Sequence, residues 1–365
     1  MSTTSKTASS RLAFIDWTRG LAAVIMLQGH VFHSLTRRDL HDSGPYVLSQ
    51  FVGGMPPAIF LFLLGVTLAF LMDSREKKGD TAGRRVTAAL RRAGYLILIA
   101  FAFRLQLWAF ALPHQPWTDL FRVDILNAMA LAVAAFSPMA VFRTEDRVRL
   151  CAVLGVAVAA VSPLVAQFDL SGVHPFVRGY LVPDPLFFGF FPWAAFVAFG
   201  LSAGSALRLL KAEHYDRAMQ WACLLGLGLI VGGRYFSSLP YSLYSKSDFW
   251  LDGPGLTFIK LGVILLILSF AFLWTRYGVG QRWSWIRQFG MTSLLVYWVH
   301  VELVYGFWLW KWKENLTVAE SAVAAVAVIL LMLALSLVRT NWNRWWTMRP
   351  GWLWYWRIER RYSGD

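Results

Sequence analysis

The chain has 365 residues, of which 57% are apolar and only 15% are charged, whereas an average soluble domain carries about a quarter of its residues as charged types. A soluble protein of this size would need more charged side chains to cover its surface, so the composition excludes an ordinary soluble enzyme. The formal net charge of +14, on so apolar a background, favours an anionic membrane surface over nucleic acid. The 19 Trp residues agree, because indole rings gather where hydrocarbon meets water.

Apolar stretches long enough to cross a bilayer of about 30 Å recur along the whole chain. They are continuously apolar and do not alternate as barrel strands do, so they predict helices. We therefore predict an all-α fold, a polytopic transmembrane helical bundle of about ten spans. The predicted spans are 12–35, 46–72, 88–112, 122–141, 148–167, 183–207, 218–236, 255–275, 289–310 and 317–338.

Lys and Arg residues are divided unevenly between the loops on the two sides of this bundle. The loops on the side of both termini hold 24 of them, and the opposite loops hold 6. Because cytoplasmic loops retain basic residues, we place both termini in the cytoplasm and the protein in the cell (inner) membrane as a multi-pass protein. We expect a disordered cytoplasmic N-terminus over 1–10, a transmembrane domain over 11–338 and a basic, Trp-rich interfacial cytoplasmic tail over 339–365.

A few charged residues fall inside the predicted spans or at their ends. They are Asp16, Arg19, Arg104, Arg122, Asp124, Arg234, Lys260 and Glu302. Ionisable groups in a bilayer are costly, so they usually face a bundle interior or a polar cavity and pair with one another. The predicted topology places most of them toward the outer face, together with His30 and His300. We therefore expect an internal polar cavity that is reached from outside.

The first span carries three of these polar residues on one face. Arg19 and His30 are eleven positions apart, which returns a helix to within about 20° of its starting direction. Asp16 lies one turn before Arg19, so the three residues form a polar stripe about 20 Å long. Such a stripe could hold an elongated ligand. Alternatively, Asp16 and Arg19 form an ion pair that fixes helix packing while His30 is a hydrogen-bonded core histidine, and the spacing alone does not choose between these readings.

The same residues carry a resemblance to a known family. The segment RLAFIDWTRGLAAVIMLQGH at 11–30 resembles the opening of the heparan-alpha-glucosaminide N-acetyltransferase catalytic-domain family of integral-membrane acyltransferases. The spacing from Arg19 to His30 is typical of the related acyltransferase-three glycan O-acyltransferases. Further similar segments are PPAIFLFLLGVTLAF at 56–70, FRVDILNAMALA at 121–132, FFPWAAFVAFGLSAG at 190–204 and GMTSLLVYWVHVELVYG at 290–306.

The resemblance implies a transmembrane acyltransferase domain over 11–338 and an acyl-CoA-dependent enzyme. It implies transfer of an acyl group, usually acetyl, from cytoplasmic acetyl-CoA to an amine or hydroxyl of a saccharide or glycoconjugate on the outer side. It also implies that His30 is the catalytic histidine. Arg19, beside Asp16, would belong to the residues that bind the donor or stabilise the motif.

An imidazole that titrates near neutrality suits this chemistry. His30 could act as a general base in direct transfer, or as a nucleophile that forms a transient acyl-imidazole. Arg19 offers a forked set of donors for a phosphate or another polar part of the coenzyme. The candidate residues for binding substrate or coenzyme are Arg19, Arg104, Arg122, Asp124, His300 and Glu302.

Two pairs among these candidates have alternative roles. Arg122 and Asp124 lie where an outer cavity would open, and they could bind sugar hydroxyls, orient His30 or form ordinary ion pairs. His300 and Glu302 are two positions apart and do not share a face of a regular helix. We expect one of the two to face the site, and Glu302 is the better candidate because an unpaired carboxylate there would be expensive.

Other residues are assigned structural roles. His33 lies one turn beyond His30, but no nearby carboxylate or cysteine completes a metal-binding set, so we expect no metal. The glycines at 200–204 and 226–233 are expected to be close-packing points between spans. Four arginines of the predicted loop after the second span mark topology and could also attract the anionic coenzyme. They are Arg84, Arg85, Arg91 and Arg92.

Two other classes of function fit part of the sequence. Intramembrane charges and ten spans are equally compatible with a transporter of a polar or anionic solute, although no matched pair of interrupted spans is seen in two halves. A membrane scaffold would leave the stripe of Asp16, Arg19 and His30 without a purpose. The expected partners are acyl-CoA, a saccharide or glycoconjugate acceptor and the lipid bilayer, without nucleic acid, and a homodimer is compatible with the sequence.

Overall fold

The computed structural model describes residues 12–111, 116–170, 172–185, 187–241, 243–278 and 282–347. Over these residues the chain is helical, with two isolated β-bridges and no strand. The predicted N-terminal segment 1–10 and the part of the predicted tail after Thr347 lie outside the described residues.

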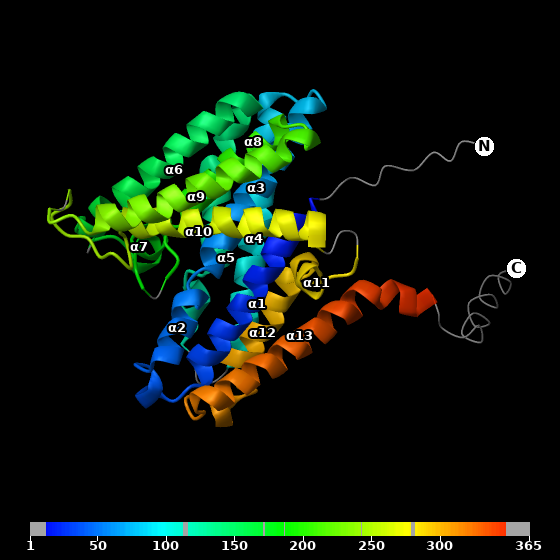
Figure 1. Cartoon of the computed structure of the whole chain (residues 1–365). Helices are drawn as coiled ribbons and strands as arrows, with labels where there is room; N and C mark the ends of the chain where they lie inside the picture. Colours follow the sequence, from blue (N-terminus) through cyan, green and yellow to red (C-terminus); the bar gives the residue numbers. More distant parts are fainter. Residues whose placement is uncertain are drawn as a thin grey trace, which may run out of the picture.

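Helices follow each of the ten predicted spans (Figure 1). Their bounds are α1 (Ala13–Leu35), α2 (Gly44–Gly53), α3 (Pro56–Lys77), α4 (Ala82–Phe110), α5 (Ile125–Phe136), α6 (Thr144–Gln167), α7 (Pro175–Leu181), α8 (Ala194–Leu209), α9 (Tyr215–Ser237), α10 (Pro254–Leu273), α11 (Trp285–Met291), α12 (Ser293–Tyr305) and α13 (Val318–Thr347). Short turns of 3-10 helix occupy Arg38–Leu40, Trp117–Phe121, Ser137–Val141, Ala212–His214 and Trp310–Trp312, and a π turn occupies Trp274–Gly278.

Length and composition identify membrane-spanning helices within this set. Among the described residues, six segments are long and apolar enough to cross a membrane, at 44–77, 82–110, 117–141, 144–167, 254–278 and 318–342. The helices α8 and α12 are apolar but shorter. This chain is therefore a helical membrane protein.

The structure differs from the predicted spans at several helix boundaries. The second span is two helices, α2 and α3, because the chain turns at Gly54 just before Pro56 and Pro57. The sixth begins only at Ala194, eleven residues late, because three prolines lie in the segment 183–192. The ninth is broken at Thr292 into α11 and α12. The last helix does not end at the predicted boundary after 338 but continues to Thr347.

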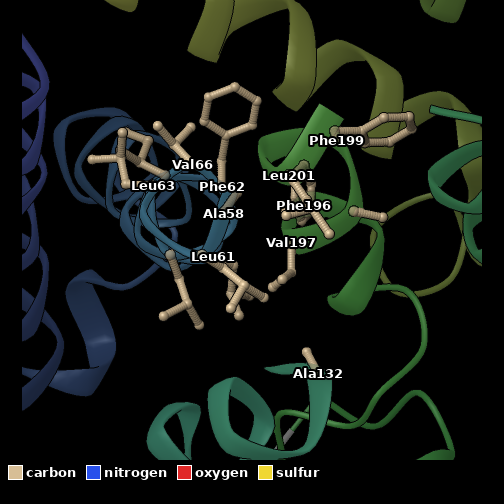
Figure 2. Packing of buried hydrophobic residues seen from close by; sticks show 14 of the residues in the cluster. Ala58, Leu61, Phe62, Leu63, Val66, Ala132, Phe196, Val197, Phe199 and Leu201 are labelled. Atoms are coloured by element: carbon tan, nitrogen blue, oxygen red, sulfur yellow. The ribbon is translucent and has the colours of Figure 1, made fainter. Parts of the chain in front are cut away.

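The helices pack in two groups that lie on either side of a central region (Figure 1). On one side α1 packs against α11, α12 and α13, and on the other α3 and α6 pack against α8 while α9 packs against α10. Apolar side chains fill the contact between α3 and α8, where Leu61 and Phe62 lie beside Phe196 and Val197 (Figure 2). Helices α4 and α5 pack together and complete the bundle behind this core.

Glycines permit two of these helix crossings to be very close. A Cβ atom at Gly200 of α8 would overlap the carbonyl oxygen of Phe62, and one at Gly290 of α11 would overlap that of Asp16. The glycines Gly226 and Gly233 of α9 face backbone oxygens of α10 in the same way. The prediction that the glycines at 200–204 and 226–233 are packing points between helices is confirmed for Gly200, Gly204, Gly226 and Gly233, and it is wrong for Gly228 and Gly232, where a Cβ atom would meet nothing within 4 Å.

Gly200→Ala is expected to lower the free energy of unfolding by about 1–3 kcal/mol, because its methyl group forces α3 and α8 apart. The measurement is the thermal unfolding temperature of the detergent-solubilised protein. Gly228→Ala is the matched control, since a Cβ atom there meets nothing within 4 Å and alanine favours helix. Equal destabilisation by both substitutions would contradict the packing role of Gly200.

Candidate active site

Two histidines from opposite ends of the sequence meet inside the bundle. His30 lies on α1 and His300 lies on α12, and the distance from His30 Nδ1 to His300 Nε2 is 2.9 Å. Their rings are nearly parallel, with centroids 5.1 Å apart and an interplanar angle of 18°. His300 is fully buried. The contact joins two elements that are 270 residues apart in the sequence.

The hydrogen-bond partners fix the protonation of both rings. His300 Nδ1 lies 2.7 Å from the carbonyl oxygen of Val296, and a carbonyl can only accept, so this nitrogen carries the proton. In neutral His300, Nε2 is then an acceptor, and His30 Nδ1 must donate to it. His30 Nε2 is left with its lone pair and takes no hydrogen bond from a described residue. This nitrogen is the one that can accept a proton or attack a carbonyl carbon.

Tyr305 completes the aromatic surroundings of His30. Its ring lies edge-on to the His30 ring, with centroids 5.3 Å apart, and its hydroxyl lies 3.2 Å from His33 Nδ1. Tyr305 is on the same helix as His300, five residues later. The C-terminal half of α12 therefore contacts His30 through two side chains.

Asp16 and Arg19 form the predicted ion pair, with Arg19 Nη1 donating to Asp16 Oδ1 at 3.0 Å. The pair lies where α1 crosses α11, next to the close contact at Gly20 and Gly290. Asp16 is buried, whereas Arg19 is half-buried and reaches the cavity described below. Both interpretations of the polar stripe thus have support. Asp16 lies in a helix contact, as the packing interpretation requires, and Arg19 faces the cavity, as the ligand-binding interpretation requires.

Asp124 and Arg104 form a second ion pair, at 2.8 Å between Asp124 Oδ2 and Arg104 Nη2. Asp124 is also the N-cap of α5, where its Oδ1 accepts from Ile125 N and the side chain of Asn127 completes a capping box. Asp124 is therefore first a structural link between α4 and α5.

Glu302 is held by neutral donors from two directions. Gln106 Nε2 of α4 donates to its Oε2 at 3.3 Å, and Trp308 Nε1 donates to its Oε1 at 3.2 Å. Gln106 is oriented in turn by Trp298 Nε1, which donates to its Oε1. Glu302 is buried, and no Lys or Arg of the described chain lies within ion-pair distance of it.

A cavity of about 2040 Å³ runs through the region between the two helix groups. It is lined by His30 and by five of the predicted binding residues, Arg19, Arg104, Arg122, Asp124 and Glu302. The side chains of Asp16 and His300 do not line the cavity, but each contacts a residue that does: Asp16 contacts Arg19, and His300 contacts His30. The structure thus brings all the predicted site residues to one cavity or to its immediate support.

Basic residues gather at one end of this cavity. Lining arginines there are Arg75, Arg84, Arg91, Arg92 and Arg339. Arg75 pairs with Asp80, whereas the other four form no ion pair with a described residue. Unneutralised guanidinium groups at the mouth of a cavity attract and bind anionic groups such as phosphates. Arg85 lies outside the lining and pairs with Glu76 instead.

The other end of the cavity is fixed by contacts between the end of α1 and the segment that joins α12 to α13. Ser34 Oγ donates to the carbonyl oxygen of Val304, and Thr36 forms a parallel bridge with Leu316. Outside these contacts Arg38 pairs with Glu314 at 2.7 Å, and this guanidinium holds the pKa of Glu314 below its usual range. These links keep α1 and α12 in the register that joins the two histidines.

Two charged residues of the predicted spans that were not assigned to the site lie away from the cavity, and two polar residues beside the site were not predicted. Arg234 is exposed at the end of α9, and the Lys260 ammonium lies 5.0 Å from the centre of the Trp193 ring, outside the cavity lining. Gln106 and Tyr305 were missed, because neutral polar residues in an apolar helix give no charge signal. Among the described residues, no three His, Cys, Asp or Glu side chains are grouped as a metal site would require.

The fold and the cavity together define an integral-membrane protein with a histidine-centred internal site. Residues 11–235 match the family model described as heparan-alpha-glucosaminide N-acetyltransferase, catalytic, and the chain belongs to that family. It is accordingly a membrane transferase of an acetyltransferase family whose members act on saccharides. No curated protein matches the chain. The matched residues include His30, Arg104 and Asp124, whereas His300 and Glu302 lie beyond them.

Proposed function

We propose that the protein transfers an acetyl group from acetyl-CoA, taken up at the basic end of the cavity, to a saccharide or glycoconjugate acceptor at the other end. The basic end is the cytoplasmic side of the cell (inner) membrane, both termini lie on that side and ten segments cross the bilayer. His30 is the catalytic residue, Arg19 and Arg104 contact donor or acceptor, and Arg122 lies at the acceptor end. No metal takes part in this proposal.

The continuity of the cavity is the observation that carries this proposal. On α4 alone, lining residues extend from Gly83 to Phe110, which is about 40 Å of helix at 1.5 Å per residue. This exceeds the hydrocarbon thickness of about 30 Å. One open space therefore joins His30 to the four arginines that form no ion pair with a described residue. A donor with a phosphate-bearing head and a distant thioester requires such a space.

The arrangement of helix ends supports the ten crossings. Arg208 at the end of α8 pairs with Asp73 near the end of α3, at 2.6 Å, as two segments that run in the same direction would allow. Gln288 in α11, at the start of the ninth predicted span, bonds to Thr340 near the end of α13, as two segments that run in opposite directions would allow. Both contacts are consistent with segments that alternate in direction.

The chemistry follows from the fixed tautomer of His30. The free Nε2 can take a proton from the acceptor nitrogen or oxygen as that atom attacks the thioester carbonyl carbon. The carbon–sulfur bond then breaks, and the proton passes from Nε2 to the leaving sulfur, which gives the coenzyme thiol. His300 stabilises the imidazolium form in between, because its Nε2 accepts from His30 Nδ1 throughout.

The proposal is tested with purified protein in liposomes, radiolabelled acetyl-CoA and a panel of amino and neutral sugars. The expected result is label on a sugar, with acetyl-CoA accepted from one side of the membrane and sugar from the other. Uptake of a solute without transfer of label would point to the transporter. Absence of both acetyl-CoA binding and label transfer would overturn the proposal.

Arg91→Gln combined with Arg92→Gln is expected to raise the KM for acetyl-CoA about tenfold or more, because charged hydrogen bonds from these arginines to the coenzyme are lost. The kcat should change little, since these bonds contribute to binding of the coenzyme and not to the transfer step. The measurement is the initial rate as a function of acetyl-CoA concentration. Arg143→Gln with Arg149→Gln is the matched control, since both residues are exposed, lie near the same level and do not line the cavity. Equal KM changes in the two double variants would show that the effect is general electrostatics.

A further inference from the structure

The two walls of the cavity meet near the histidines and separate toward its basic end. Phe103 of α4 packs against Trp298 of α12, with ring centroids 5.2 Å apart, and Gln106 of α4 bonds to Glu302. Apart from these contacts α4 packs against α3 and α5, whereas α11 and α13 pack against α1 and against each other. Over the described residues, α4 therefore faces α11 and α13 across the cavity without extensive packing between them.

Three large hydrophobic residues of these walls line the cavity and are also exposed on the outside of the protein. They are Tyr95 of α4, Met291 at the end of α11 and Leu294 of α12, with exposed fractions of 54%, 44% and 38%. Residues that line a cavity and also reach the outer surface mark a place where the cavity is not enclosed. We call this gap between α4 and the junction of α11 with α12 the side opening.

Contacts with α1 and α13 give the depth of the side opening. Gly290, the neighbour of Met291, packs against the carbonyl group of Asp16, one turn inside α1. Two residues earlier, Gln288 bonds to Thr340 near the end of α13. The side opening therefore lies near the membrane surface on the side where α1 begins and α13 ends. Exposed hydrophobic residues at this depth contact the acyl chains of the adjacent leaflet.

Cationic residues stand at the rim of the side opening. Arg91 and Arg92 precede Tyr95 by one turn of α4, and Arg339 lies on α13, on the opposite wall. All three arginines line the cavity, are exposed and form no ion pair with a described residue. The acidic residues that line the cavity lie toward its other end and are Asp119, Asp124 and Glu302. Guanidinium groups beside an exposed hydrophobic surface match the two parts of an anionic phospholipid, its phosphate and its acyl chain.

We infer that the side opening binds an anionic phospholipid of the adjacent leaflet. Its phosphate lies between Arg92 and Arg339, and one acyl chain lies against Tyr95, Met291 and Leu294. A zwitterionic lipid carries its own ammonium group, so its headgroup leaves the arginines without net compensation. An anionic lipid supplies the missing charge, as anionic headgroups do in basic pockets between the helices of other membrane proteins.

Lipid and coenzyme compete in this arrangement, because the same arginines are proposed to hold the phosphates of acetyl-CoA. The lipid occupies the side opening while the coenzyme is absent, and it compensates guanidinium groups that pair with no described acid. Binding of acetyl-CoA then displaces the lipid headgroup. This competition rests on the proposed function, whereas the lipid site itself does not.

A simpler interpretation is that bulk lipid touches the exposed residues without any preference. The two interpretations predict different responses to the headgroup. Bulk contact gives equal occupancy for anionic and zwitterionic lipids, and this occupancy does not depend on Arg339. A specific site prefers the anionic headgroup and loses much of that preference when a guanidinium group is removed.

The experiment uses the full chain in phosphatidylcholine nanodiscs that contain a small share of a photoreactive probe lipid. One probe is phosphatidylglycerol and the other is phosphatidylcholine, and both carry the same diazirine-bearing acyl chain. After illumination, mass spectrometry locates the label on the peptides that contain Tyr95, or Met291 and Leu294. We expect phosphatidylglycerol to label these peptides about fivefold or more above phosphatidylcholine, which is the contribution of one arginine near a membrane surface.

Arg339→Gln is expected to lower labelling by phosphatidylglycerol about fivefold, and Arg339→Lys to retain much of it because lysine keeps the charge. Arg143→Gln is the matched control, since Arg143 is exposed but does not line the cavity. Leu294→Trp should lower labelling at Tyr95, because the indole fills the side opening. Leu98→Trp should not, since Leu98 is exposed on α4 but lies outside the cavity lining.

The outcomes separate the lipid site from the proposed function. Equal labelling by the two probes, equal effects of Arg339→Gln and Arg143→Gln, or loss of label in Arg339→Lys would each overturn the inference. In a further arm, saturating acetyl-CoA is added before illumination. A fall in labelling would support the competition for shared arginines. Headgroup-selective labelling that acetyl-CoA leaves unchanged would support the lipid site and contradict the proposed donor site.

Discussion

His30→Ala is expected to reduce kcat for acetyl transfer about 10²- to 10⁴-fold, the range that general acid–base groups contribute. In the proposed mechanism His30 Nε2 accepts the acceptor's proton and returns it to sulfur, and the variant removes this nitrogen while the arginines at the far end of the cavity remain. Binding of acetyl-CoA should therefore be retained. The measurements are kcat from initial rates and the Kd of acetyl-CoA by calorimetry on the same preparation.

His33→Ala is the matched control for His30. His33 is one turn further along α1 and lines the same cavity, but its Nδ1 faces the Tyr305 hydroxyl. We expect a small change in kcat from its removal. Full activity of His30→Ala, or an equal loss in both variants, would show that His30 is not the catalytic residue. Acetylated His30 trapped in the absence of acceptor would assign the nucleophilic form of the mechanism in place of the general base.

His300→Phe is expected to reduce kcat about 100-fold with little change in the KM for acetyl-CoA. The phenyl ring keeps the stacking on His30 but offers no acceptor for His30 Nδ1–H. The catalytic ring then loses the partner that fixes its tautomer and stabilises its charged form, a loss that is severe in other histidine-based sites. The proposed mechanism makes His300 a positioning residue, because it contacts His30 and does not line the cavity.

A structural role alone would not produce the same signature. NMR of isotope-labelled histidine should show His30 protonated on Nδ1 in wild type and a mixture of tautomers in His300→Phe. A variant with an unchanged tautomer and a reduced unfolding temperature would contradict the positioning role. A kcat near that of wild type would contradict it as well.

The sequence predicts most of the helices but not where the chain interrupts them. Hydropathy locates ten apolar stretches. Each is predicted to be a helix, because a segment within a membrane must satisfy its backbone hydrogen bonds internally. It does not separate α2 from α3, although Pro56 and Pro57 stand at that boundary, because the residues on both sides remain apolar. The break at Thr292 has no proline at all. It lies two residues after Gly290, which packs against α1 in a tertiary contact that hydropathy does not show.

The candidate site is predictable in part for a related reason. Charged residues in apolar helices are visible from composition, and the helical period places Arg19 and His30 on one face. The period also predicts that His300 and Glu302 diverge, and in the structure one contacts His30 while the other lines the cavity. Which histidine meets which depends on how α1 and α12 pack. The neutral residues that orient the charges, such as Gln106, become visible only in the structure.

The contact between His30 and His300 joins the first described helix to the twelfth, across 270 residues. During synthesis α1 must therefore enter the membrane long before the helix that completes its site exists. Asp16 and Arg19 both lie on α1, so their ion pair can form as soon as this helix has formed. The pair then neutralises two charges in the membrane before α12 has been synthesised. The imidazole acquires its fixed tautomer only when α12 arrives. A nascent or truncated chain can thus hold the opening motif in the membrane and still lack the histidine contact on which the proposed mechanism depends.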